Sequence, residues 1–134
     1  MSETGARIAA HARSLVGTPF RLHGRSAETG LDCVGLVEQC CNAAGRPLTV
    51  PPTYALRNCD ISAILIFAQR DDVTTAFGTF EAGDILLTSP GPAQHHLLIV
   101  TASTHCVHAH AGLRRVVETP MPSPWPILRH WRFI

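Results

Sequence analysis

Cys33 is the residue whose predicted position would make it chemically reactive. The segment from Leu31 to Gly45 has apolar residues at helical spacing, and Asp32 is a good N-cap residue, so Cys33 falls in the first turn of a helix. At that place the helix dipole and unpaired backbone N–H groups favour a thiolate, and we expect the thiol pKa to fall from about 8.5 towards neutrality. The same N–H groups can stabilise an oxyanion when the sulfur attacks a carbonyl. The position predicts a nucleophile.

Two histidine-bearing segments supply candidates for the base that a cysteine nucleophile needs. Residues 94–100 read QHHLLIV and residues 105–110 read HCVHAH. Only the four residues 101–104 separate them, which is short enough for an antiparallel hairpin. The sequence therefore predicts two paired strands that carry imidazoles side by side.

The register of this hairpin decides which imidazoles meet. A turn centred on Ala102 places His96 opposite His108, whereas a turn centred on Ser103 places His96 opposite His110. In either case His96 stands at the strand start as the base, and the second imidazole orients it. A shift by one index unit would turn His108 to the other face of the sheet.

The remaining cysteines have simpler expected roles. Five cysteines form an odd set without a CxxC pair, so reduced thiols are expected. Four of them are expected to be small buried apolar residues: Cys40, Cys41, Cys59 and Cys106. A zinc site from Cys106, His108 and His110 is not expected, because alternate residues of one strand point outward in a row rather than converge.

The remaining histidines are expected away from the reactive site. His95 is expected on the opposite face of its strand from His96. Four more are expected in loops or at the surface: His11, His23, His105 and His130.

The elements that position these residues change type along the chain. The first third reads as helical: residues 8–16 end at Gly17-Thr18-Pro19, and the cysteine helix ends at Gly45 before Pro47. A short helix is expected over residues 61–69, with Asp60 as cap and Ile61, Ile64, Leu65 and Ala68 inward. Residues 21–30 and 50–58 read as loops.

The second half reads as short strands separated by Gly, Pro and Ser. The expected strands cover residues 84–88, 96–101, 105–110, 114–119 and 128–134. Helices followed by strands predict a single α+β domain over residues 1–134, in which an antiparallel sheet packs on the helices.

Composition and charge exclude several classes of function. The chain has 134 residues, 46% hydrophobic and 16% charged, as in an ordinary globular domain. The net charge of +1 gives no field that would attract nucleic acid or an acidic membrane. No apolar stretch is long enough to span a bilayer, and the first 14 residues lack the apolar core of a secretion signal. We expect synthesis in the cytoplasm, without a nucleic-acid or membrane partner.

Together these segments resemble the NlpC-type family of cell-wall cysteine peptidases, which have a papain-like fold. The resemblance runs from Leu15 to about Val117. It is carried by LVGTPFRLHGRS, GLDCVGLVEQC, EAGDILLT, HHLLIV and VHAH, and by the twelve-residue step from His96 to His108. It implies Cys33 as nucleophile, His96 as base and His108 as the orienting third group, without a cofactor. It also implies Asp32, Phe20 and Tyr54 as residues that contact substrate.

The resemblance implies a substrate and a context as well. The family cleaves amide bonds in the stem peptides of peptidoglycan. The compact form resembles members encoded with phage, prophage and gene-transfer-agent tails, and so implies tail proteins as partners and action at the cell wall. Two positions depart from the family: Val34 replaces the usual serine after the nucleophile, and Phe20 replaces a tyrosine whose hydroxyl helps the oxyanion hole. Tyr54, the one tyrosine, is a candidate replacement donor.

Three alternatives to a hydrolase follow from the same features. The first is a weakly active or inactive wall-binding or tail module that has lost an oxyanion donor. The second is an acyltransferase that uses the same thiol chemistry. The third is a redox-sensing thiol protein, which the lack of an obviously spaced resolving cysteine disfavours.

Overall fold

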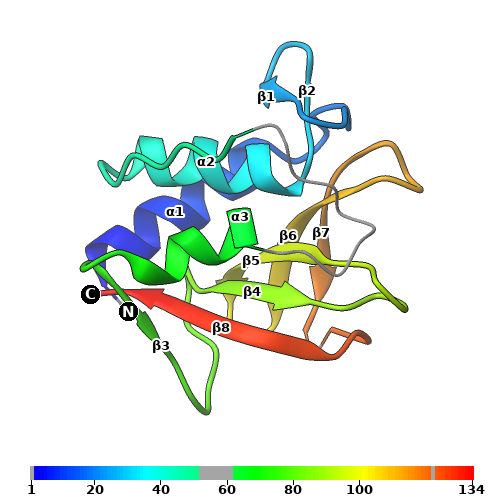
Figure 1. Cartoon of the computed structure of the whole chain (residues 1–134). Helices are drawn as coiled ribbons and strands as arrows, with labels where there is room; N and C mark the ends of the chain where they lie inside the picture. The colour runs from blue at the N-terminus through cyan, green and yellow to red at the C-terminus, as the bar shows by residue number, and fades with distance from the viewer. Residues whose placement is uncertain (1, 52–61, 122) are drawn as a thin grey trace.

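The structure is a computed structural model in which residues 2–51, 62–121 and 123–134 are described. Helices and a six-stranded sheet form two layers, with α1 and α2 on one face of the sheet (Figure 1). The predicted α+β class, with helices packed on an antiparallel sheet, is confirmed. Among the described residues, no helix combines the length and the apolar character that crossing a membrane requires.

Both long helices begin with the side-chain caps that their sequences favour. α1 (Glu3–Ser14) is capped by Ser2, whose hydroxyl accepts a hydrogen bond from the backbone N–H of Gly5. α2 (Cys33–Ala43) is capped by Asp32, which accepts from the N–H of Gly35 at 2.8 Å. The predicted helix start at Cys33 is therefore confirmed, and the Asp32 cap fixes the first turn of α2.

The structure differs in detail from two predictions, one for a loop and one for a helix. The predicted loop over residues 21–30 contains β1 (Arg25–Ser26), which pairs with β2 (Gly30–Leu31). The predicted helix over residues 61–69 is a short α3 (Ser62–Leu65) followed by the 3-10 turn η1 (Ile66–Gln69). Because a 3-10 turn has three residues per turn, Phe67 points inward and Ala68 is exposed, contrary to the prediction. Asp60 and Ile61 lie outside the described residues.

The sheet has the order β3-β8-β4-β5-β6-β7, and all neighbouring strands are antiparallel. The strands are β3 (Val73–Thr75), β4 (Ile85–Thr88), β5 (His96–Ala102), β6 (His105–His110), β7 (Arg115–Pro120) and β8 (Ile127–Phe133). Five of them match the predicted strands to within one or two residues at their ends. β3 was not predicted, because its three residues carry no apolar alternation and depend on pairing with β8.

The hairpin of β5 and β6 has the register that a turn near Ser103 predicts. Ile99 pairs with Val107 and Val100 with Cys106, and a bulge follows before Ala102. When this register is continued towards the start of β5, His96 lies opposite His110 and diagonal to His108. The register predicted for a turn centred on Ala102 differs from this one by two residues, so His108 lies on the same face of the sheet in both.

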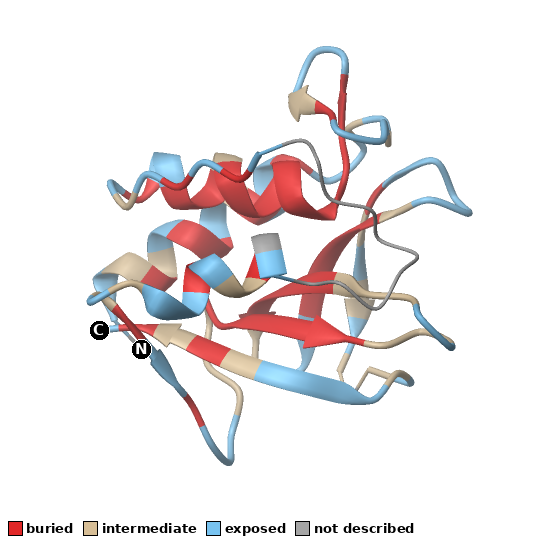
Figure 2. Cartoon of the chain, viewed as in Figure 1, coloured by how far each residue is buried: buried red, intermediate tan, exposed pale blue. Residues whose placement is uncertain are grey.

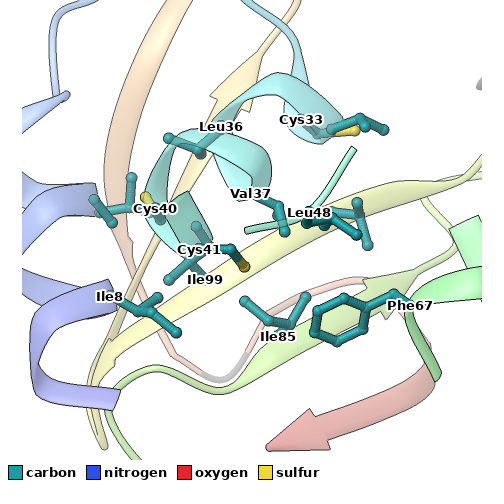
Figure 3. Close-up of a cluster of buried hydrophobic side chains, with 14 of the residues drawn as sticks. Ile8, Cys33, Leu36, Val37, Cys40, Cys41, Leu48, Phe67, Ile85 and Ile99 are labelled. Atoms are coloured by element: carbon teal, nitrogen blue, oxygen red, sulfur yellow. The ribbon is translucent and has the colours of Figure 1, made fainter. Parts of the chain in front are cut away.

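Alternation along β5 divides the apolar core in two. Leu97 and Ile99 belong to a large cluster between the sheet and the helices, whereas Leu98 and Val100 belong to a smaller cluster on the other face. Buried residues concentrate in α2 and the central strands (Figure 2). Cys40 and Cys41 are buried in the large cluster, as predicted (Figure 3). Cys106 is buried in the smaller cluster, also as predicted, and Cys59 lies outside the described residues.

His130 is not the surface residue that was predicted. Its Nε2 lies 2.6 Å from Asp84 Oδ2, and the Asp84 side chain is completely buried. Arg132 donates to both oxygens of the same carboxylate. Alternation along β8 places the side chains of His130 and Arg132 on the side of Asp84, so this cluster joins β8 to the turn before β4.

Candidate active site

Cys33 opens α2 at the end of the helix that faces β5. Its side chain is completely buried, in the same layer as Cys40 and Cys41 but at the other end of the helix (Figure 3). The backbone N–H groups of Leu97, Val34 and Cys33 itself lie near the sulfur and act to lower its pKa. Because Leu97 follows His96 directly, the sulfur lies against the start of the strand that carries the predicted base.

The environment raises the pKa of the Cys33 thiol to about 12. Burial is the largest cause, and the neighbouring Asp32 carboxylate adds to it, while the three backbone N–H groups act in the opposite direction. The predicted shift towards neutrality is therefore wrong for this structure, because desolvation outweighs the effect of the helix end. Cys33 rests as a neutral thiol.

His96 and His108 are joined directly. His96 Nε2 lies 2.9 Å from His108 Nδ1, with the two rings nearly perpendicular. Burial lowers the pKa of His96 to about 3, and the neighbouring histidines His108 and His110 add to the shift. Burial also lowers the pKa of His108 to about 4, with His110 contributing. Both imidazoles rest neutral, so one proton is shared between the two facing nitrogens.

Trp125 covers this histidine pair. Its ring centroid lies 5.5 Å from that of His96 and 5.6 Å from that of His108, edge-on in both cases. The residue comes from the segment before β8 and packs at the margin of the smaller core cluster. The local sequence does not predict this role for Trp125, because the position of the residue depends on how the chain returns towards β8.

The sulfur and the base lie at one strand end but are not hydrogen-bonded. Among the residues that the structure describes, no hydrogen bond joins Cys33 Sγ to His96, whose Nε2 is directed at His108. His96 is the first residue of β5, and its ring packs against those of His108 and Trp125.

Asp32 is engaged by the protein. Its buried carboxylate accepts from Gly35 N, from His23 N at 2.8 Å and from Arg25 Nη1 at 3.2 Å. Arg25 also forms an ion pair with Glu38 on α2 at 3.0 Å. Asp32 therefore fixes the segment of β1 against the first turn of α2. A direct contact with substrate, as predicted, would require this network to open.

The other predicted substrate contacts are placed differently. Phe20 is partly buried against the large core cluster and forms a bridge with Leu31, so it flanks the start of α2 without a hydroxyl to donate. Tyr54 lies outside the described residues. Within the described ranges no group of three or more His, Cys, Asp or Glu side chains could hold a metal ion.

The fold is that of NlpC/P60 domains. The NlpC2 protein of Trichomonas vaginalis superposes with a TM-score of 0.70 and 16% identity, over 98% of this chain and 49% of that one. An NlpC/P60 family protein of Bacillus cereus superposes at 0.65 and 16%, over 92% and 38%. The NlpC/p60 domain of the peptidoglycan hydrolase SagA superposes at 0.60 and 21%, over 87% and 88%.

These similarities are structural. The sequence matches no protein-family model, and no curated protein is significantly similar to it. The chain spans about half the length of the Trichomonas protein and less of the Bacillus protein, but most of the SagA domain. The fold predicted from the sequence motifs is thus confirmed, while the roles of the site residues stay predictions.

Proposed function

We propose that this protein is a cysteine peptidase or amidase that hydrolyses amide bonds in peptidoglycan stem peptides. The observation that carries the proposal is the position of Cys33: its sulfur lies near the backbone N–H of Leu97, which directly follows His96, and His96 is paired with His108. An NlpC/P60 fold shared with a peptidoglycan hydrolase domain supports this substrate class.

The proposed reaction has two stages. The Cys33 thiol transfers its proton to His96 Nδ1, and the sulfur attacks the amide carbonyl carbon. The backbone N–H groups beside the sulfur stabilise the resulting oxyanion. The carbon–nitrogen bond then breaks, and His96 returns the proton to the leaving amine. Water, deprotonated by His96, hydrolyses the thioester and restores the thiol.

Substrate binding has a specific task in this scheme. In the resting structure the pKa of Cys33 is high and the pKa of His96 is low, so the neutral pair is favoured. We propose that proton transfer occurs together with attack, when the substrate carbonyl is close and the developing charge on oxygen faces the N–H groups. His108 then supports the His96 imidazolium through the bond of 2.9 Å.

Digestion of purified peptidoglycan tests the proposal. We expect the wild-type protein to release new amino groups and Cys33→Ala to lose at least about 1000-fold of that rate. Cys40→Ala is the matched control, because Cys40 is a buried thiol of the same helix that lies in the apolar cluster. Its rate should stay within a few-fold of wild type under conditions in which both variants are folded.

Three results would contradict the proposal. Equal rates for Cys33→Ala and wild type would remove the thiol from the mechanism. Binding to peptidoglycan without release of amines would indicate a wall-binding module instead. Transfer of the acyl group to an added amine, without hydrolysis, would indicate an acyltransferase. Action as part of a phage-like tail, with tail proteins as partners, stays a prediction from the sequence.

A further inference from the structure

The hydrogen-bonded chain that begins at His96 continues beyond His108. His108 Nε2 lies 3.2 Å from the hydroxyl oxygen of Thr119, and this oxygen lies 3.4 Å from the sulfur of Cys106. His108 is almost completely buried. Both ring nitrogens of His108 therefore have a defined partner, His96 on one side and Thr119 on the other.

Strand pairing places Thr119 where it meets the ring. Cys106 on β6 pairs with Thr119 on β7, and His108 pairs with Val117. Thr119 is thus the diagonal neighbour of His108 on the same face of the sheet. Glu118, the residue before it, points to the other face and bonds Thr101 and Arg13 instead.

Counting protons defines two arrangements of the neutral chain. In the first, His96 Nε2 donates to His108 Nδ1, and His108 Nε2 donates to the Thr119 oxygen. In the second, His108 Nδ1 donates to His96 Nε2, and the Thr119 hydroxyl donates to His108 Nε2. In the second arrangement the one N–H proton of neutral His96 is on Nδ1, so Nδ1 has no lone pair to receive a proton from a thiol.

The protonated form of His96 removes this ambiguity. An imidazolium carries protons on both nitrogens, so His96 Nε2 must donate to His108 Nδ1. His108 is then protonated at Nε2, and the Thr119 oxygen has to accept. A hydroxyl can take this role because its own proton can turn towards the Cys106 sulfur.

We propose that Thr119 is a positioning residue: its hydroxyl oxygen accepts the Nε2 proton of His108 and keeps the Nδ1 lone pair of His108 directed at His96. The role in turnover rests on the proposed function, whereas the proton arrangement does not. Thr119 acts through His108 and has no contact with the reacting atoms. The sequence alone does not predict this role of Thr119, because only the β6–β7 register brings the side chains of Thr119 and His108 together.

Long-range proton–nitrogen NMR spectra of the histidines test the arrangement directly. We expect His108 to be protonated at Nε2 in the wild type and in Thr119→Ser, which keeps the hydroxyl. Thr119→Val has nearly the same shape but no acceptor, so it should shift His108 towards protonation at Nδ1 or mix the two forms. Thr101→Val is the matched control, because Thr101 is a threonine of the same sheet that bonds Glu118.

Peptidoglycan kinetics provide the second readout. Thr119→Val should lower kcat about tenfold with KM unchanged, and Thr119→Ser should stay within about threefold of wild type. His108 protonated at Nδ1 in the wild type would overturn the proposal, as would a tautomer and kcat unaffected by Thr119→Val. Failure of the hydrolase proposal is distinguishable: the protein would then show the expected tautomers without turnover.

Discussion

At the scale of single residues, Cys33 is held between opposing influences. The helix end and three backbone N–H groups favour the thiolate, while complete burial and the Asp32 carboxylate favour the thiol and prevail. A cysteine nucleophile at a helix start is therefore not automatically a thiolate.

The first prediction concerns the reactivity of Cys33 without substrate. Because its pKa is raised to about 12, only a small fraction is ionised at neutral pH. We expect alkylation of Cys33 by iodoacetamide to accelerate about tenfold per pH unit from pH 7 to pH 10, without a plateau. Peptide mapping by mass spectrometry follows the rate at this residue. A plateau with an apparent pKa near 7 would contradict the neutral resting thiol.

Sequence reasoning identified the residues that signal themselves locally. Asp32 before an apolar helical pattern predicts the cap, and hence the place of Cys33. The spacing of His96 and His108 predicts a hairpin that brings two imidazoles together. The resting pKa of Cys33 was predicted wrongly, because burial depends on packing between α2 and β5 that no local pattern specifies.

At the scale of elements, the site depends on how three segments meet at the start of β5. The segment of β1 is tied to the first turn of α2 through Asp32, and the segment before β8 covers the histidine pair. These contacts join residues far apart in the chain. Trp125 and Thr119 could not be predicted for this reason, since their roles follow from strand order and register.

The second prediction tests the contact between β1 and α2. Gly35 lies in the first turn of α2, and a Cβ there would overlap with the backbone carbonyl of Gly24. Gly35→Ala should therefore push the two segments apart and lower the free energy of unfolding by about 2 kcal/mol. Urea unfolding measures the change. The control is Ser14→Ala, at an exposed position of α1. Gly45→Ala is unsuitable as a control because Gly45 has a positive φ of 76°.

An unchanged stability for Gly35→Ala would contradict the close packing of these segments. A loss of stability without any change at the site would also be informative, because Gly35 donates the capping hydrogen bond to Asp32. Hydrogen exchange at the Gly35 amide would then show whether the cap persists.

The third prediction concerns the cover over the histidines. Trp125 excludes water from His96 and His108, whose pKa values are lowered chiefly by burial. Trp125→Ala should let water reach the rings, so both pKa values should rise towards the ordinary value of about 6.5. NMR titration of the histidine ring protons measures the shift. The amide chemical shifts of α1, which packs on the other face of the sheet, are the control and should not change.

Values that stay near 3 and 4 in Trp125→Ala would contradict the role of this side chain as a cover. In that case the strands themselves, rather than the segment before β8, would keep water from the rings.

At the scale of the whole molecule, the buried carboxylate of Asp84 joins two parts of the sheet through a cluster of polar contacts. Asp84 accepts from His130, from Arg132 and from the backbone N–H of Glu81, and so links β8 to the turn that leads into β4. β4 in turn pairs with β5, which starts with His96. The cluster thus supports the strand that carries His96.

The fourth prediction is a pH-dependent loss of stability. Burial raises the pKa of Asp84, but hydrogen bonds from Arg132, Glu81 N–H and His130 outweigh it and leave the pKa below its ordinary value. A lowered pKa means that the carboxylate stabilises the fold above pH 4 and that this contribution is lost as the pH falls. Asp84→Asn should cost about 3 kcal/mol at pH 7, and the difference from wild type should shrink below pH 4.

Thermal or urea unfolding between pH 3 and pH 7 measures this difference. Glu3→Gln is the control, because the Glu3–Arg7 pair on α1 is exposed and should contribute nothing measurable. A constant difference between Asp84→Asn and wild type across this range would contradict the assignment of the charge. The fold class could be predicted from alternating patterns, but this cluster could not, because His130 read as a surface residue.

Trapping of the acyl-enzyme determines whether Cys33 attacks the substrate. Wild-type protein is incubated with a peptidoglycan stem peptide and quenched in acid within one turnover, and mass spectrometry then locates any covalent adduct. We expect the acyl part of the peptide as a thioester on Cys33, with the amine fragment released in equal amount. No adduct on Cys33 during ongoing hydrolysis, or an acyl group on another residue, would contradict this expectation.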